Sequence, residues 1–418
     1  MKIKVKEATY EEVLKKKPNR HKLPLSSMAF LRAIVKIYAK KELKKVNFTA
    51  TIDDDTKYNE PCLYLMNHSS FTDLLIAFHL IPHRFSTVCT DDGFIGKEWL
   101  LRHLGCIPTM KFITDPTLVR DMLFVKKILH QSILMYPEAS YSFDGTATTL
   151  PESLGKLAKL LKMPVVMIKT DGSFLRDPLY NNLQIRNVDV KAKVSLIASK
   201  DEVLSLESSV IEQRIKDAFT FDNFATQMKE GILIKEPFRA DSLNRVLFRC
   251  PLCNQEGMME GKGITLTCHN CHTVYTMQEN GQMTTDNPQF TLHHIPDWFK
   301  YEREIIRQEI LDGVYHEEFD CEIYILKNLK AIYHIGSGHL THSTEGFHLV
   351  GASGKLDYWH KAIYSYSLYS DFYWYELGDI VCIGDDKMRY YCIPKNRKDI
   401  VSRLRLAAEE IFKLIAKK

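Results

Sequence analysis

Residues 62–78 read CLYLMNHSSFTDLLIAF: an apolar run, a short polar turn that contains His68 and Asp73, and a second apolar run. The first run is short and continuous, as in a strand buried on both faces, and the second has the spacing of a helix. The Ser and Thr residues between them are good helix caps. We therefore predict His68 at a strand-to-helix turn, the place where open α/β sheets put their binding and catalytic groups.

His68 and Asp73 are five positions apart, so the carboxylate can reach back to the imidazole across about one helical turn. If Asp73 accepts a hydrogen bond from one ring nitrogen, the other nitrogen is unprotonated and can take a proton from a hydroxyl group. The alternative is a helix-capping Asp beside an unrelated His. These residues alone leave both interpretations open.

The sequence His68-x4-Asp73, preceded by Asn67, resembles the catalytic motif of the glycerophospholipid acyltransferases, the lysophosphatidate (PlsC-type) acyltransferase family. Three later blocks follow in the family's order. Residues 105–111 (GCIPTMK) are similar to its second block, 136–142 (YPEASYS) to its third block, F-P-E-G-T-R-S, and 163–167 (MPVVM) to its fourth. The resemblance extends over roughly residues 25–230.

The resemblance implies that His68 is the general base and that Asp73 orients it. It also implies substrate contacts at Asn67, Lys111, Glu138, Ser140 and Tyr141. The reaction implied is transfer of an acyl chain from acyl-CoA or acyl carrier protein to the free hydroxyl of a lysophospholipid, such as 1-acyl-glycerol-3-phosphate. Such a step belongs to phospholipid biosynthesis or remodelling. No nucleophilic side chain of the protein is required, because a thioester is activated enough for direct attack.

Two blocks depart from the family pattern. Lys111 replaces the Arg that ends the second block, and Ala139, Ser140 and Tyr141 replace Gly, Thr and Arg in the third. In the family those arginines are taken to hold the acceptor phosphate. Arg presents a planar set of donors to phosphate, whereas Lys offers a point charge and Tyr only a hydroxyl. A lysophospholipid with a headgroup, or another hydroxylated lipid, is therefore an alternative acceptor to lysophosphatidate.

Residues 46–235 are predicted to form an α/β sandwich with a mostly parallel sheet, the acyltransferase domain, because apolar strand patterns alternate with helical ones. Glu138 follows a strand and is expected at the same sheet edge as His68, and the apolar block 165–168 is expected to line a slot for the acyl chain. The predicted strands are 62–66, 85–90, 106–110, 132–137, 165–170 and 184–197, and the predicted helices are 72–81, 96–103, 116–130, 151–162 and 208–230.

Residues 1–45 contain fourteen Lys or Arg and four Glu, a net charge of +10 in a chain whose total is +4. Within them, residues 28–39 place Phe30, Ile34, Ile37 and Tyr38 at helical spacing, with lysines on both sides. A basic amphipathic helix is suited to the surface of an anionic membrane. The alternative is an ordinary surface helix that packs on the domain.

Cys250-x-x-Cys253 and Cys268-x-x-Cys271 are separated by fourteen residues, the ligand set and spacing of a four-thiolate zinc ribbon, predicted over 245–280. Four sulfurs complete a tetrahedral sphere, so the Zn²⁺ is expected to be structural, and His269 and His272 are expected not to bind it. Iron in a rubredoxin-like site is a second option.

Residues 315–418 are predicted to form a PH-like or GRAM-like β-barrel with a terminal helix over 397–418, because short alternating segments with glycine turns precede one amphipathic helix. Such modules bind lipid headgroups or proteins, and fold analogy does not distinguish the two. A helix is also expected near 297–313.

With 418 residues the chain can hold two or three domains, and its ten cysteines favour a reducing compartment. We expect no signal peptide and no membrane span, since no apolar stretch of roughly 20 residues is present. The predicted location is the cytoplasm, peripheral at the inner face of a membrane. Three functions follow: a lysolipid acyltransferase, a catalytically weak lipid-binding scaffold, and a nucleic-acid-binding protein, for which no reading motif is found.

Overall fold

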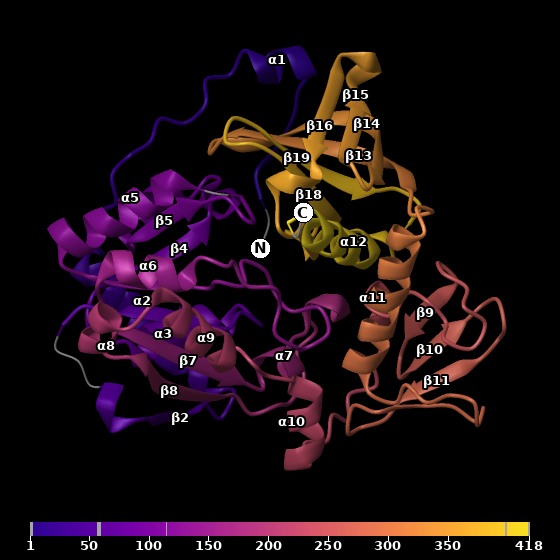
Figure 1. Ribbon diagram of the computed structural model, residues 1–418, viewed down its shortest axis with the longest axis horizontal. Helices are drawn as coiled ribbons and strands as arrows, with labels where there is room; N and C mark the ends of the chain where they lie inside the picture. The colour runs from indigo at the N-terminus through magenta and orange to yellow at the C-terminus, as the bar shows by residue number, and fades with distance from the viewer. Residues whose placement is uncertain (1–2, 57–59, 114, 398, 417–418) are drawn as a thin grey trace.

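The computed structural model describes residues 3–56, 60–113, 115–397 and 399–416, and contains three sheets (Figure 1). The first sheet has the order β2-β8-β7-β3-β6-β4-β5, and every neighbouring pair is parallel except β7 with β8. Its strands are β2 (Thr49–Ile52), β3 (Leu63–Met66), β4 (Phe85–Thr90), β5 (Cys106–Thr109), β6 (Ser132–Met135), β7 (Val165–Asp171) and β8 (Lys191–Ala198). The mostly parallel α/β architecture agrees with the prediction.

Both faces of this sheet are covered, because successive residues of β3, β6 and β7 point into different cores. Leu63 and Leu65 belong to one core, and Tyr64 and Met66 belong to the other. Helices α2 (Ala29–Lys44) and α3 (Thr72–Leu80) supply the second core, and α5 (Pro116–Phe124), α6 (Leu154–Leu161), α8 (Lys200–Ser205) and α9 (Ser208–Ala218) supply the first. Central β3 is therefore held from both sides.

Several predicted boundaries differ from the structure. The predicted strand 184–197 is regular only over β8, and the predicted helix 208–230 is broken into α9 and α10 (Asn223–Glu230). Asp222 causes this break, since its carboxylate accepts a hydrogen bond from the Ala225 N–H (2.8 Å) and caps α10. The short strand β2 was not predicted because its residues are exposed and carry no apolar pattern.

The cysteine pairs belong to a four-stranded antiparallel sheet with the order β12-β11-β10-β9, which we call the ribbon. Its strands are β9 (Met259–Lys262), β10 (Thr265–Cys268), β11 (Val274–Met277) and β12 (Met283–Thr284). The long helix α11 (Ile295–Leu311) runs from this ribbon to the C-terminal sheet (Figure 1). Ribbon, α11 and C-terminal sheet share one hydrophobic core, in which Trp298 is fully buried.

The C-terminal sheet has the order β16-β15-β14-β13-β19-β18-β17. Its strands are β13 (Glu317–Asn328), β14 (Ala331–Ser343), β15 (Gly346–Gly351), β16 (Leu356–Lys361), β17 (Tyr369–Trp374), β18 (Gly378–Gly384) and β19 (Arg389–Pro394). Helix α12 (Ile400–Ile415) packs against it, as predicted. Among the described residues β16 and β17 do not pair with each other, so the closed barrel of the prediction is not shown.

The first forty-five residues contribute to two different parts of the structure. Strand β1 (Val5–Glu7) pairs in parallel with β14 of the C-terminal sheet and is followed by α1 (Tyr10–Leu14). Helix α2 instead packs on α3, where the buried Arg32 guanidinium donates a hydrogen bond to the Ile81 carbonyl (2.8 Å). No helix of the described residues combines the length and the apolar character needed to cross a bilayer.

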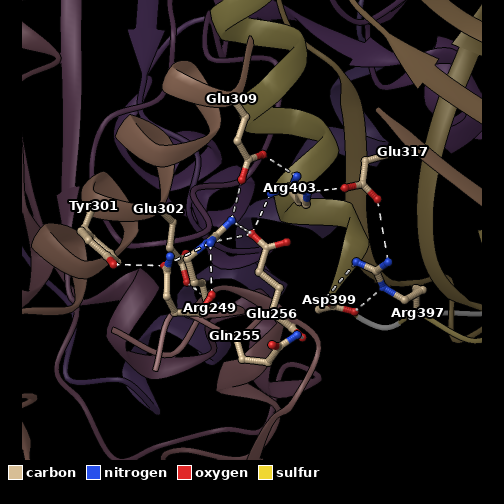
Figure 2. Close-up of polar contacts among 11 residues, drawn as sticks. Arg249, Gln255, Glu256, Tyr301, Glu302, Glu309, Glu317, Arg397, Asp399 and Arg403 are labelled. Atoms are coloured by element: carbon tan, nitrogen blue, oxygen red, sulfur yellow. Dashed lines mark hydrogen bonds and ion pairs between the residues drawn. The ribbon is translucent and has the colours of Figure 1, made fainter. Parts of the chain in front are cut away.

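A partly buried ion network joins the ribbon to the C-terminal elements (Figure 2). Arg249 contacts Glu256 (2.6 Å) and Glu309 of α11 (2.7 Å). Arg403 of α12 contacts the same two carboxylates (2.7 and 2.6 Å) and also Glu317 of β13. Removing one member would leave a buried charge without its partner, so the network favours a single arrangement of these elements.

Candidate active site

His68 lies directly after β3, at the carboxyl end of the central strand, and Asp73 lies in the first turn of α3. Nδ1 of His68 is 3.1 Å from Oδ2 of Asp73. The Asp73 side chain is fully buried, and 23% of the His68 side chain is exposed. With the aspartate accepting from Nδ1–H, the Nε2 lone pair is left for an external proton donor.

The Asp73 carboxylate is held by the turn itself. Its Oδ2 also accepts hydrogen bonds from the backbone N–H groups of Ser69 (2.7 Å) and Ser70 (3.0 Å). These donors lie at the N-terminus of α3, where the helix dipole favours negative charge. The carboxylate therefore stays in one position and fixes the imidazole orientation.

Two tyrosine rings pack on the imidazole of His68. Tyr136 and Tyr141 each lie 4.2 Å from it, centroid to centroid, at interplanar angles of 29° and 31°. Two rings at this distance do not fit on one face of an imidazole, so they lie on opposite faces. An aromatic face attracts a cation, and the stacked pair therefore favours the imidazolium that forms when His68 takes a proton.

Glu138, Asn67 and Ser140 do not line the cavity beside His68, and all three are buried. Oε1 of Glu138 accepts from the His68 N–H (3.1 Å), and its Oε2 accepts from the Thr148 N–H (2.8 Å). Burial raises the pKa of Glu138 to about 7. Glu138 thus ties the His68 turn to a second loop.

The side chains of Asn67 and Ser140 also form hydrogen bonds with the backbone. Oδ1 of Asn67 accepts from the Thr170 N–H (2.7 Å), and its amide donates to the Thr170 carbonyl (3.0 Å), which ties the ends of β3 and β7 together. The Ser140 hydroxyl donates to the Tyr141 carbonyl (2.9 Å). Ala139, which stands where the family has Gly, adopts a φ of 54°, the left-handed region that favours glycine.

A cavity of about 1060 Å³ opens beside His68, at the upper end of the usual range for ligand pockets. Its apolar part lies between α5 and α6 and is lined by Leu118, Val119, Met122, Leu154, Leu157 and Leu160. The prediction that residues 165–168 line the acyl slot is wrong. Their side chains are at most 1% exposed and fill the cores on both sides of the sheet.

Lys111 and Tyr141 line the same cavity as His68. The Lys111 ammonium lies 4.0 Å from the ring centroid of Tyr369, a residue of β17. Burial lowers the pKa of Lys111, and the nearby carboxylates of Asp371 and Asp92 oppose that effect.

The C-terminal sheet and α12 form a second wall of this cavity, which sequence reasoning did not find. The wall consists of Tyr366, Tyr369, Asp371, Phe372, Tyr373, Trp374, Tyr375, Glu376, Phe412, Lys413 and Ala416. The high density of aromatic residues in 364–375 was visible in the sequence, but nothing there connects that segment to His68. We call these residues the C-terminal wall.

Residues 35–169 match the family model Acyltransferase. This stretch is therefore similar to an acyltransferase domain. It contains His68, Asp73, Lys111 and the third block, but not the ribbon or the C-terminal wall. The family match therefore supports acyltransferase activity. The C-terminal wall of the cavity is formed by residues outside the match.

Among solved structures, this chain is similar to the 1-acyl-sn-glycerophosphate acyltransferase PlsC from Thermotoga maritima. The match has a TM-score of 0.38 and 11% identity, and covers 45% of this chain and 76% of that chain. A comparison with curated proteins gave no match.

Outside the acyltransferase domain, the four predicted cysteines come together at one end of the ribbon, with their sulfur atoms all within 4.8 Å of one another. The Cys250 and Cys271 sulfurs are 3.7 Å apart, and those of Cys253 and Cys268 are 3.6 Å apart. A tetrahedron with Zn–S bonds of about 2.3 Å requires S–S distances of roughly 3.8 Å. The cluster therefore fits a four-thiolate metal ion.

Two hydroxyl groups lie beside these sulfurs. The Tyr275 hydroxyl is 3.2 Å from the Cys250 sulfur, and the Thr273 hydroxyl is 3.2 Å from the Cys271 sulfur. Hydroxyls in these positions can donate to thiolates and orient them. His269 instead contacts Glu260 (2.9 Å), an arrangement that leaves the ligand set to sulfur alone.

Proposed function

We propose that this protein transfers an acyl chain from a thioester donor, acyl-CoA or acyl carrier protein, to the free hydroxyl of a lysophospholipid. The observation that carries the proposal is the His68–Asp73 pair at the edge of a large cavity whose inner part is apolar. The acyltransferase-family match over the same residues supports the reaction type.

In the proposed reaction Asp73 holds Nδ1–H, and Nε2 of His68 removes the proton of the acceptor hydroxyl as its oxygen attacks the thioester carbonyl carbon. A C–O bond forms and the C–S bond breaks when the tetrahedral intermediate collapses. The departing thiolate takes the proton back from the imidazolium. The rings of Tyr136 and Tyr141 stabilise that imidazolium while it exists.

The proposed acyl slot is the space between α5 and α6. Its leucine, valine and methionine side chains offer an apolar surface that leads to His68. An acyl chain placed there loses contact with water, which is favourable by roughly 0.8 kcal/mol for each buried methylene. Asn67, Glu138 and Ser140 position the His68 turn and the third block rather than contact the substrates.

We also propose that α2 rests on a membrane. Among its apolar residues, Phe30 is 74% exposed, Ile37 is 72% exposed and Tyr38 is 54% exposed. The lysines at 40, 41, 44 and 45 extend the positive charge along the same helix. Exposed apolar side chains beside lysines favour binding to an anionic lipid surface. We propose that this surface is the inner face of a membrane. Such contact would bring a lipid substrate to the protein.

The four ribbon cysteines are proposed to hold one structural Zn²⁺. The ion would complete the ribbon, and through Arg249 and Glu256 it would support the arrangement of α11 and α12. A closed set of four sulfurs leaves no position for a reacting water, so the metal takes no part in acyl transfer.

A catalytically weak lipid-binding scaffold is the second candidate. It is favoured by the third block, where Tyr141 stands in place of the family's Arg. Acyl transfer by the purified protein, from acyl-CoA and from acyl carrier protein to a panel of lysolipids, separates the two. The enzyme proposal predicts turnover with at least one acceptor, and lipid binding without turnover across the panel would establish the scaffold.

A further inference from the structure

The C-terminal wall of the cavity is built by residues far in sequence from the acyltransferase-family match. Eight residues between 366 and 376 and the end of α12 line the cavity, whereas the match ends at residue 169. The properties of this wall therefore belong to this chain and do not follow from the family motif.

The C-terminal wall is firmly attached to the acyltransferase domain. Arg389 of β19 forms an ion pair with Asp91, and Asp92 accepts hydrogen bonds from the Tyr369 hydroxyl and from the Trp374 indole (3.3 Å). All of these groups are largely buried. The wall is thus a fixed part of the cavity.

Lys111 is the residue that the resemblance places at the acceptor phosphate, but its charge is already partly balanced. Asp371 and Asp92 both favour its ammonium form, and the face of Tyr369 covers the ammonium at 4.0 Å. A phosphate monoester carries close to two negative charges at neutral pH, and in this cavity it would meet the lysine Lys111 and the carboxyl group of Asp371. The negative charge of the Asp371 carboxylate disfavours a dianionic ligand there.

Asp371 presents a carboxylate without a full set of donors. Its Oδ1 is buried and has no hydrogen-bond partner among the described residues. Burial raises the pKa of Asp371 to about 7, while Lys111 acts in the opposite direction. Asp371 as a whole lines the cavity, and a cation on a ligand would favour its charged form as Lys111 does.

We propose that Asp371 and the aromatic rings of the C-terminal wall select a zwitterionic lysophospholipid, whose phosphate lies at Lys111 and whose headgroup ammonium lies at Asp371. This inference rests on the proposed function and names its acceptor class. A zwitterion satisfies the lysine and the carboxylate together. The rings of Tyr369, Trp374 and Tyr375 line the same cavity and add the attraction of aromatic groups for a cation.

The test compares kcat/KM for three acceptors, lysophosphatidylethanolamine, lysophosphatidylcholine and lysophosphatidate, with one acyl chain and one donor. Wild-type protein is expected to prefer the ethanolamine lipid over lysophosphatidate by about tenfold or more. Asp371→Asn removes the charge with little change in shape, and is expected to reduce that preference by about tenfold. Asp386→Asn, an exposed acid of the same unit, serves as the control and is expected to leave the preference unchanged.

A wild-type preference for lysophosphatidate would overturn the inference and leave the proposed function intact, and this comparison does not depend on the folding of any variant. An ammonium-lipid preference that survives Asp371→Asn would overturn the role of Asp371. A larger fall in kcat/KM for the choline lipid than for the ethanolamine lipid in Asp371→Asn would support recognition by charge and ring contact. Absence of turnover with every lysolipid would instead contradict the proposed function.

Discussion

Arg405 of α12 donates a hydrogen bond from Nη1 to the backbone carbonyl of Tyr141 (3.3 Å), the residue whose ring lies on His68. The same guanidinium lies 4.5 Å from the ring centroid of Phe143, which stacks on Phe372 of the C-terminal wall (4.3 Å). The third block is therefore held from the C-terminal end of the chain. Arg405 also stands near the place where the family motif would supply its own Arg.

Arg405 is accordingly predicted to be a positioning residue. Arg405→Gln should lower kcat by about tenfold with little change in the donor KM, because the Tyr141 ring loses its fixed place on His68. Arg405→Lys should recover part of the loss. Steady-state kinetics of both variants, with Arg307→Gln on α11 as a matched control, provide the measurement. Equal losses in kcat for the Arg405 and Arg307 variants would contradict this role.

Metal analysis should find about one zinc per chain, and Cys253→Ser should lose most of it. The ribbon should then open, and limited proteolysis should cut residues 250–280 faster than in the wild type. His269→Ala is the matched control, since His269 bonds Glu260 and should leave the zinc content unchanged. Wild-type protein purified without any bound metal would refute the proposed site.

Two buried histidines of the C-terminal sheet, His342 and His360, are predicted to contribute a loss of stability in mild acid. Burial lowers the pKa of His342 to about 3 and that of His360 to about 4. Both are neutral in the folded state, whereas the unfolded chain binds protons near its ordinary pKa of about 6.5. Between those values the unfolded state holds more protons, so the free energy of unfolding decreases as the pH falls, by about 2 kcal/mol per histidine at pH 5.

His342→Gln should remove the contribution of His342, about 2 kcal/mol between pH 7 and pH 5. The Gln side chain has both a donor and an acceptor, so it can replace the hydrogen bond between His342 Nδ1 and the Tyr315 hydroxyl (2.9 Å), which limits the cost at pH 7. Urea unfolding at pH 7 and pH 5 measures the difference. His348→Gln, at a partly exposed histidine of β15, is the control. An unchanged slope in His342→Gln would show that His342 does not titrate as described.

Membrane contact through α2 predicts that the double substitution Phe30→Asp and Ile37→Asp abolishes co-sedimentation with anionic vesicles while thermal stability is retained. Both side chains are exposed, so their loss removes lipid contact and no core packing. Leu311→Asp, an exposed apolar residue at the end of α11, is the control. Vesicle binding that persists in the double variant would place the membrane surface elsewhere.

Short motifs in the sequence predicted two features of the structure. The turn that holds His68 and Asp73 and the four ribbon cysteines are local patterns whose side-chain chemistry restricts the geometry. The acyl slot was misplaced on 165–168, because a strand buried in a core and a strand that lines a cavity have the same apolar composition. The helices that line the cavity, α5 and α6, were predicted as helices without that role.

The C-terminal wall could not be predicted, because its contact with His68 joins residues about 300 positions apart in the sequence. Strand β1, only Val5–Glu7, is too short to show a pattern, yet it joins the N-terminal segment to β14. A closed barrel was expected from strand number and glycine turns alone. Neither feature determines which edges of a sheet meet.

The central claim is that the imidazole of His68, oriented by Asp73, removes the proton from the acceptor hydroxyl. Its most direct test is the kcat for acyl transfer from acyl-CoA to the best lysolipid, measured for wild type, His68→Ala, Asp73→Asn and, as control, Asp217→Asn on the surface of α9. We expect His68→Ala to lose about a thousandfold or more and Asp73→Asn about a hundredfold, with KM values little changed and Asp217→Asn unaffected. A kcat of His68→Ala equal to that of the wild type would contradict the account.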